Sequence, residues 1–312
     1  MKISILDMRD AFFDALYLIA KSDKNVVLLT DDFGAPSLDK FRKDLAKQYI
    51  NAGISEQNMV SVAAGLALCD KKVYMYAISP FVTVRCYDQI KVDLCVMNLP
   101  VTAVGVGAGF AYDNAGPTHH SIDDISVMRV LPNMTVYSPS DSVMAAALAE
   151  ISYKSIGPEY IRFDRGKTQI FYDDNEHFGE GLKELRSGED VLLISSGVMT
   201  GRAHEIAHEL EKSNLKAGVI DLYRIKPLNE KLLLKIVSAY DKIVTLEEHL
   251  LGGGLGSLIA EFMADNKVLK PLKRIAISDS RAYSYGDRKS LQAYCGLDLN
   301  SCVKCVLDWI KS

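Results

Sequence analysis

Three consecutive segments of the 312-residue sequence carry side chains that are typical of an enzyme site. Glu56 lies in GISEQNM, Phe81 follows the next predicted strand, and the pair His119 and His120 follows the strand after that. In α/β proteins, ligand sites form at the carboxyl ends of strands. A histidine in such a loop titrates near neutral pH and can carry a proton. The spacing therefore predicts one site that combines a carboxylate, an aromatic ring and an imidazole.

Each of these residues also has a purely structural interpretation. Glu56 begins an apolar helical stretch, where a carboxylate stabilises the first turn through the helix dipole and by capping free N–H groups. His119 and His120 follow Gly116 and Pro117 in a turn, where a histidine can simply be exposed. The residue types alone leave both interpretations open, and the recurrence at successive strand ends is what favours a site.

The elements that would position these residues alternate regularly. Short β-branched runs predict strands, and longer stretches with helical periodicity predict helices. This order is typical of a parallel β-sheet covered by helices. The strands are expected at 25–29, 72–78, 101–106, 134–138 and 159–163, and the helices at 7–21, 55–68, 81–96 and 141–153.

The alternation stops in a polar, turn-rich stretch near 168–188 and then resumes. We therefore predict an α/β protein with two domains, a first over residues 1–170 and a smaller second over 188–312, joined by a linker over 171–187. The second series has strands at DVLLISS, AGVIDL, KIVTLEE and RIAIS, with helices near 200–213 and 229–238 and from residue 255.

Three further motifs have structural explanations that we prefer. HEIAH at 204–208 matches the zinc-protease pattern HExxH, but an apolar stripe occupies the opposite helix face and no third ligand is apparent. GGGLG at 252–256 could bind an anion at a helix N-terminus, yet without GxGxxG spacing it predicts a tight turn. Cys302 and Cys305 lack the second pair that zinc requires. We expect no metal ligands in this chain.

Composition argues against several other classes. The net charge is −4, with 48% hydrophobic and 24% charged residues, so nucleic acid is not an expected partner. No run approaches the ~20 apolar residues of a membrane span, and acidic residues interrupt the N-terminal segment where a signal peptide needs an apolar core. We expect a cytoplasmic protein whose six cysteines are reduced.

Taken together and in this order, the motifs resemble those of the transketolase family of thiamine-diphosphate enzymes. The resemblance covers nearly the whole chain and implies a pyrimidine-binding domain over 1–170 and a transketolase C-terminal domain over 188–312. The two segments that are specific on their own are GISEQNMVSVAAGLAL, similar to the family's glutamate-bearing helix, and GPTHH, similar to its histidine loop. Phe81 with YDQI, and SSGVMT, TLEEH and GGGLG in the second domain, also match in order.

The resemblance implies roles around the cofactor. Glu56 would be the acid that faces N1′ of the aminopyrimidine ring and favours its 4′-imino tautomer. Phe81 would stack on that ring, with Arg85 and Tyr87 as weaker candidates near it. His119 would transfer protons at the substrate.

His120 is the second choice for that proton transfer, and Arg165 in IRFDRG resembles a phosphate-binding arginine of the 1-deoxyxylulose-5-phosphate synthases in the family. Two departures bear on the substrate. Ala115 stands where transketolases usually have an acidic residue that meets a substrate hydroxyl. Asp113 is the nearest carboxylate and is the candidate to bind substrate in its place. The region 104–109 lacks the second phosphate-binding arginine of the synthases.

The family's diphosphate- and magnesium-binding GDG motif is absent, since the chain has only YGDR at 285–288. The resemblance therefore implies the C-terminal subunit of a two-subunit, thiamine-diphosphate-dependent transketolase-like enzyme, active only with a separately encoded partner. That partner would hold most of the thiamine diphosphate and Mg²⁺, in an expected heterotetramer. The reaction would transfer a two-carbon ketol unit between sugars or sugar phosphates.

Two alternatives remain open at this point. The beta subunit of a 2-oxoacid dehydrogenase shares the glutamate helix and TLEEH, although GPTHH argues against it. A non-catalytic paralogue that binds and regulates a complete enzyme is the other, although the joint retention of Glu56, Phe81 and His119 argues against decay.

Overall fold

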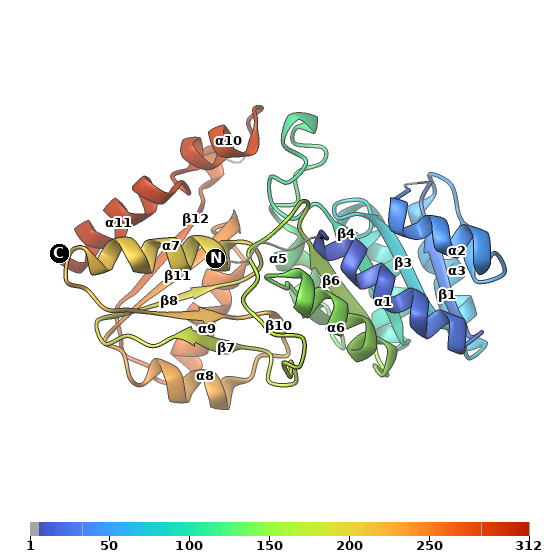
Figure 1. The fold of residues 1–312 in the computed structure, drawn as a ribbon, viewed down its shortest axis with the longest axis horizontal. Helices are drawn as coiled ribbons and strands as arrows, with labels where there is room; N and C mark the ends of the chain where they lie inside the picture. The colour runs from blue at the N-terminus through green and yellow to red at the C-terminus, as the bar shows by residue number, and fades with distance from the viewer. Residues whose placement is uncertain (1–5, 33, 282, 312) are drawn as a thin grey trace.

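Two β-sheets, one in each half of the sequence, organise the protein (Figure 1). The computed structural model describes residues 6–32, 34–281 and 283–311. The first sheet has the strand order β10-β5-β6-β4-β3-β1-β2, with parallel neighbours except for β10. Its first-half strands are β1 (Val26–Thr30), β2 (Tyr49–Asn51), β3 (Lys72–Ile78), β4 (Val101–Val106), β5 (Thr135–Tyr137) and β6 (Glu159–Phe163).

Helices cover both faces of this sheet because its central strands are apolar on both sides. Along β1, Val26 and Leu28 pack into one core cluster, and Val27 and Leu29 pack into the other. One face carries α1 (Met8–Ser22) and α6 (Ser142–Tyr153), and the other carries α3 (Glu56–Leu68) and the π-helical η3 (Ile90–Val96). The shorter elements are η1 (Pro36–Leu38), α2 (Asp39–Asp44), η2 (Val84–Cys86), α4 (Tyr87–Gln89), η4 (Asp113–Ala115) and α5 (Asp124–Arg129).

The second sheet has the order β12-β11-β8-β9-β7, with only the edge strand β7 antiparallel. In Figure 1, α7 and α11 lie on one side of it and α8 on the other. Its strands are β7 (Lys183–Arg186), β8 (Val191–Ser195), β9 (Ala217–Asp221), β11 (Lys242–Leu250) and β12 (Leu272–Ile277). The helices are α7 (Met199–Glu211), α8 (Glu230–Val237), α9 (Leu255–Asp265), η5 (Asp279–Arg281), α10 (Arg288–Cys295) and α11 (Leu299–Lys311).

The predicted α/β class and the main elements are confirmed, although several short elements such as β2 and α2 were not predicted. Three further differences concern the site and the joint between the domains. The stretch expected as one helix over 81–96 begins with a turn and continues as η2, α4 and η3. The segment expected as a linker over 171–187 ends in β7, which joins the second sheet. The strand β10 (Arg224–Lys226) was not expected, and it crosses back to pair antiparallel with β5 of the first sheet.

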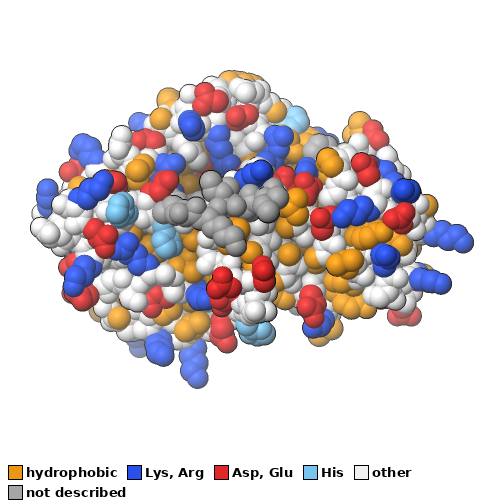
Figure 2. Space-filling view, viewed as in Figure 1, with side chains coloured by type: hydrophobic (Ala, Val, Ile, Leu, Met, Phe, Trp, Pro, Cys, Tyr) orange, Lys and Arg blue, Asp and Glu red, His pale blue; other side chains and the backbone are white. Residues whose placement is uncertain are grey.

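Two of the motifs that we interpreted as structural contribute side chains to the core of the second domain. In HEIAH, the apolar stripe of α7 packs into the core of the second domain, while Glu205 and His208 are exposed. All six cysteines are free thiols, and Cys302 on α11 is buried in the same core. Across residues 6–32, 34–281 and 283–311, no helix combines the length and the apolar character needed to cross a bilayer. On the face drawn in Figure 2, charged side chains of both signs are interspersed over both domains.

A buried polar layer joins the two domains. Arg162 at the end of β6 is 6% exposed, donates to Asp124 at 2.7 Å, and also donates to the Ser121 and Glu248 carbonyls. His249 of β11 is fully buried here, with its Nδ1 donating to the Leu250 carbonyl at 2.9 Å. Charged groups are retained at such a depth only when they are paired, so this layer fixes how the domains meet.

His249 should make the joint sensitive to acid. Its Nε2 accepts from the Ser126 N–H at 3.4 Å, so the ring bridges the domains in its neutral form. Burial lowers the pKa of His249 from 6.5 to about 4. As the pH falls below 6.5, the unfolded chain takes up a proton that the folded protein excludes, so stability is lost between pH 6.5 and 4.

We therefore expect His249 to account for about 2 kcal/mol of the stability lost between pH 7 and pH 5. Urea unfolding at both pH values should show that loss reduced by this amount in His249→Gln, whatever the absolute stability of the variant. His208→Gln on the exposed face of α7 is the control, and it should keep the wild-type difference. An unchanged pH difference in His249→Gln would show that other groups cause the acid sensitivity.

Candidate active site

Glu56 is a buried carboxylate at the first turn of α3. It is 4% exposed, whereas the rest of the helix buries only apolar side chains. Its Oε1 accepts a hydrogen bond from Nη1 of Arg85, which reaches it from η2. The carboxylate is thus held by a side chain from the next strand-end segment.

Phe81 lies directly beside this pair. It follows β3 in a turn, where its N–H donates to the Ile78 carbonyl at 2.8 Å. The guanidinium carbon of Arg85 lies 3.7 Å from the centre of the Phe81 ring. The Arg85 side chain is 43% exposed, so it covers one face of the ring without being locked in the core.

A chain of ring contacts connects this group to the histidine loop. The Phe81 and His119 rings meet edge to face at 5.2 Å between centroids, and His119 lies 6.0 Å from Tyr112. The guanidinium carbon of Arg165 in turn lies 4.2 Å from the centre of the Tyr112 ring. The structure therefore brings together Glu56, Phe81, Arg85, His119 and Arg165 in one continuous series.

The surroundings of His119 keep it neutral. Partial burial lowers its pKa from 6.5, and the charge of Arg85 lowers it further. Its Nδ1 is 2.9 Å from the Thr118 hydroxyl, which fixes the ring orientation. A neutral imidazole at pH 7 can accept a proton from a substrate hydroxyl.

An open hollow of about 190 Å³ lies next to Glu56 and Phe81. Ile54 and Ile78 contribute apolar surface to its lining, and Asp31 and Asp32 contribute carboxylates. Ile54 is 80% exposed, which is unusual for a large apolar side chain beside a buried carboxylate. The hollow thus combines three carboxylates, the buried Glu56 among them, with one aromatic ring and two isoleucines. The ring and the isoleucines suit a flat heteroaromatic ring.

Five predicted residues do not line this hollow. His119 and Arg165 belong to the series of ring contacts, and the other three have different positions. Tyr87 packs against the core of the first domain. His120 is buried, and its Nε2 donates to the Asp113 carbonyl at 3.0 Å, so it stabilises the loop from within. The Asp113 carboxylate accepts from the Arg288 backbone N–H at 3.2 Å, which directs it to the domain joint instead of toward exposed Ala115.

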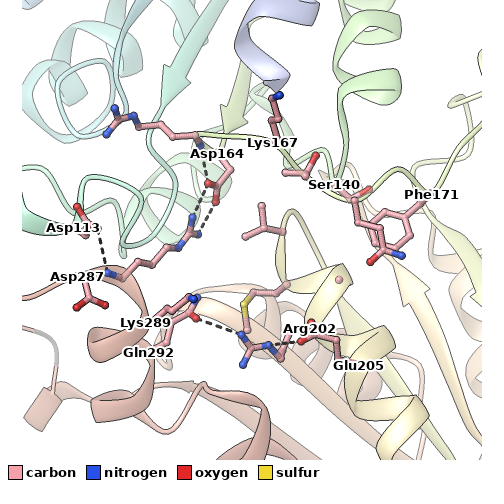
Figure 3. A pocket seen from close by; sticks show the side chains of 17 residues that line it. Asp113, Ser140, Asp164, Lys167, Phe171, Arg202, Glu205, Asp287, Lys289 and Gln292 are labelled. Atoms are coloured by element: carbon pink, nitrogen blue, oxygen red, sulfur yellow. Dashed lines mark hydrogen bonds and ion pairs between the residues drawn. The ribbon is translucent and has the colours of Figure 1, made fainter. Parts of the chain in front are cut away.

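The domain joint contains a second and larger cavity of about 720 Å³. Figure 3 shows Asp113 and Asp164 on its first-domain side and Arg202, Glu205 and Gln292 on its second-domain side. Arg165 also lines this cavity. It therefore stands between the ring contacts that lead to Glu56 and the joint between the domains.

Sequence reasoning missed several members of this site. Asp31 and Asp32 follow β1, so the strand-end rule applied to Glu56, Phe81 and His119 would have found them. Tyr112 gave no signal, because its role depends on a loop conformation that brings it between His119 and Arg165.

GGGLG forms the tight turn that we expected. The Leu255 and Gly256 N–H groups donate to the Glu247 carboxylate at 2.6 and 2.8 Å, so a side chain of the protein itself occupies the anion position at the start of α9. Gly254 leaves no room for a Cβ because the same carboxylate lies against it. Within the part of the chain that the structure describes, no group of three or more His, Cys, Asp or Glu side chains could hold a metal ion.

Comparison with known proteins gives consistent matches over both domains. Residues 4–170 match the family model of the transketolase pyrimidine-binding domain, and residues 180–302 match that of the transketolase C-terminal domain. The chain is 32% identical to one subunit of the apulose-4-phosphate transketolase of Phocaeicola vulgatus, with 100% of both chains covered. It is 33% identical to a 6-deoxy-6-sulfo-D-fructose transketolase subunit of Clostridium sp. strain MSTE9, with 87% of this chain and 85% of the relative covered.

A solved structure described as a split gene transketolase, inactive beta4 tetramer, superposes with a TM-score of 0.89 at 29% identity, covering 98% of this chain and 99% of that one. Some relatives are about twice as long as this chain, which matches less than half of their length. The 1-deoxy-D-xylulose-5-phosphate synthase of Rippkaea orientalis is 35% identical over 86% of this chain, which spans 43% of that enzyme. Homologues in this family use thiamine diphosphate. The chain therefore belongs to the transketolase family and carries its pyrimidine-binding and C-terminal domains.

Proposed function

We propose that this chain is the C-terminal subunit of a two-subunit, thiamine-diphosphate-dependent transketolase-like enzyme. The observation that carries the proposal is the buried Glu56 carboxylate beside the Phe81 ring, linked by ring contacts to His119 and Arg165. That series contains a group for the cofactor, a group for proton transfer and a group for a substrate anion. Relatives named as transketolase subunits support the same assignment.

The residues around the hollow fit the aminopyrimidine ring of the cofactor. Glu56 would hold a proton at N1′, and its burial strengthens that hydrogen bond because water is excluded. Ile54 and Ile78 would contact the apolar edge of the ring, and Phe81 would stack on its face. A stacked ring would take the place of the Arg85 guanidinium on Phe81.

The cofactor, when bound, supplies the carbon nucleophile that carries a two-carbon ketol unit. The chain's own residues would supply the rest of the site. Neutral His119 would move a proton at a substrate hydroxyl, because its pKa is lowered by burial and by Arg85. Arg165 would bind a substrate phosphate or another anion in bidentate fashion. Asp113 was a candidate to accept a hydrogen bond from the substrate hydroxyl. Its contact with the Arg288 backbone argues instead that it helps to hold the two domains together.

A partner subunit would complete the site. Ile54, which lines the hollow, is exposed, and further large apolar side chains are exposed on or next to α3, η2 and η3: Val62, Leu68, Val84, Val92, Val96 and Met97. Surfaces of this kind on soluble proteins mark sites of protein association. We propose that a separately encoded N-terminal subunit covers this face and holds Mg²⁺ and the diphosphate, with a heterotetramer as the complete assembly.

The relatives favour a sugar substrate over a 2-oxoacid. Both named relatives act, by their names, on an unusual or modified sugar. In this chain Ala115 is exposed beside His119 on the same loop and offers no hydrogen-bond acceptor for a substrate hydroxyl. We propose that the enzyme transfers a ketol unit to or from a sugar phosphate, or a similarly anionic sugar, that lacks or alters that hydroxyl.

Glu56→Gln should reduce turnover of the assembled enzyme by about 10²–10⁴-fold, because the amide cannot serve as the acid at N1′. The circular dichroism spectrum and the melting temperature should stay close to those of the wild type. Glu150→Gln, at an exposed glutamate of α6 that pairs with Lys154, is the control and should retain full activity. Turnover of Glu56→Gln within a few-fold of wild type would reduce Glu56 to a structural residue.

The isolated chain should be inactive and should bind thiamine diphosphate weakly. Adding the partner subunit should restore ketol transfer and make cofactor affinity depend on Mg²⁺. Isothermal titration with thiamine diphosphate, with and without partner and Mg²⁺, measures the cofactor affinity and its dependence on Mg²⁺. An assay of ketol transfer with and without the partner measures the activity. Robust ketol transfer by the chain alone would refute the two-subunit proposal.

Ala115→Asp should restore an acceptor for the missing contact. We expect kcat/KM for an ordinary ketose phosphate, relative to its deoxy analogue, to rise by about tenfold, as one hydrogen bond to a charged group allows. Asp113→Asn should leave the ratio unchanged, because the Asn oxygen can still accept from Arg288. A wild-type preference for the hydroxylated sugar that disappears in Asp113→Asn would show that Asp113 already fills the place.

A further inference from the structure

Arg288 of the second domain pairs with carboxylates that hold both segments proposed to bind substrate. It is the first residue of α10, and its side chain is only 22% exposed. Its Nη1 and Nη2 donate to the two oxygens of Asp164 at 2.7 and 2.6 Å, a bidentate pair drawn with dashed lines in Figure 3. Its Nε donates to Glu248 at 3.1 Å.

Each of these carboxylates holds a backbone N–H of the first domain. Asp164 accepts from the N–H of Arg165 at 2.6 Å. Glu248 accepts from the N–H of Phe110 at 2.6 Å, at the start of the loop that carries His119. The side chain of Arg288 thus fixes two carboxylates that orient Arg165 and the histidine loop.

The second domain touches the histidine loop at two further points. The backbone N–H of Arg288 donates to Asp113 at 3.2 Å. The Tyr285 ring lies against Gly116, where it leaves no room for a Cβ. Gly109 and Ser121 exchange backbone hydrogen bonds of 2.9 Å at the base of the loop, so its ends are closed within the first domain and its position is set from the second.

Only an arginine satisfies this arrangement. Asp164 is 3% exposed and Glu248 is 4% exposed, so either carboxylate would be costly if left unpaired. A guanidinium presents several donors in a fixed plane, which allows it to pair with both carboxylates at once. A lysine would supply charge without that geometry.

We propose that Arg288 is a positioning residue for substrate binding, through which the C-terminal domain sets the placement of Arg165 and of the histidine loop. This inference rests on the proposed function for its kinetic consequence. Arg288 acts through Asp164 and Glu248, and it does not touch Glu56 or the hollow beside Phe81. Replacing Arg288 should therefore weaken the binding of the sugar phosphate and leave the binding of thiamine diphosphate unchanged.

The test compares Arg288→Met, Arg288→Lys and the double variant Asp164→Asn/Arg288→Met with the wild type in the assembled enzyme. The double variant has one fewer unpaired buried charge, which protects the test if the single variant folds poorly. Arg281→Met is the matched control, since its guanidinium donates to the Tyr294 carbonyl within the second domain. Steady-state kinetics with a sugar phosphate and titration with thiamine diphosphate supply the first two readouts.

We expect Arg288→Met and the double variant to raise KM for the sugar phosphate by about tenfold or more, the effect of one lost charge-assisted contact. The kcat and the affinity for thiamine diphosphate should change by no more than about threefold, because catalysis and cofactor binding use groups that Arg288 does not touch. Arg288→Lys should recover part of the effect. An unchanged KM with a lower fraction of active enzyme would mean that Arg288 is only structural, and would overturn the proposal.

Hydrogen exchange on the full chain supplies a readout that needs no activity. In Arg288→Met, exchange should be about tenfold faster or more at the Phe110 and Arg165 amides, which donate to Glu248 and Asp164, and should also rise in the segments 108–121 and 164–168 around them. The strand 72–78 should be unaffected, as should all segments in Arg281→Met. Unchanged exchange in both segments would refute the positioning role, whereas a wild-type assembly without ketol transfer would refute the proposed function alone.

Discussion

The placement of the candidate site depends on two arginines where the domains meet, the buried Arg162 and the partly buried Arg288. Arg162 pairs with Asp124 inside the first domain, and Arg288 reaches across from the second domain to Asp164. Removing charges from water costs several kcal/mol per ion, and the cost is offset only when the pairs have good geometry and further hydrogen bonds. Both arginines meet this condition, so the joint permits only a narrow set of domain orientations.

The same joint divides the site into two parts with different supports. The part around Glu56, Phe81 and Arg85 is built on α3 and on the turn after β3, entirely within the first domain. The part around Arg165 and the histidine loop is held by carboxylates that belong to, or are paired with, the second domain. The proposed cofactor end of the site is therefore supported by the first domain alone, whereas the proposed substrate end is supported by both domains. Variation of the C-terminal domain could then alter substrate preference without altering the chemistry of the cofactor.

The sequence was sufficient to predict the elements with strong periodicity. The runs at β1, β3, β4 and β8 are apolar on both faces, and α1 and α7 have well-defined apolar stripes, so their class and approximate bounds followed from pattern alone. The strand β10 has only three residues and gains its conformation from pairing with β5, a contact across the domains that no local pattern encodes. The prediction of a single helix over 81–96 was wrong, because the first residues of this stretch form a turn that places Phe81 and Arg85 beside Glu56.

The candidate site residues also divide into those that the sequence could predict and those that it could not. Glu56, Phe81 and His119 could be predicted because they recur at successive strand ends, where the fold brings them together. Arg288 could not, since its importance depends on three acidic residues from distant parts of the chain. Glu247 was missed for the same reason, as it binds the N-terminus of α9 from the preceding strand.

The most direct test is a structure of the assembled enzyme with thiamine diphosphate bound. The proposed function predicts a Glu56 oxygen within about 2.6–3.2 Å of N1′ of the aminopyrimidine, the range of a hydrogen bond that can carry a proton. It also predicts that the ring stacks on Phe81 in the place of the Arg85 guanidinium. An aminopyrimidine ring bound elsewhere, with Glu56 still paired to Arg85 and the hollow beside Phe81 empty, would contradict the account.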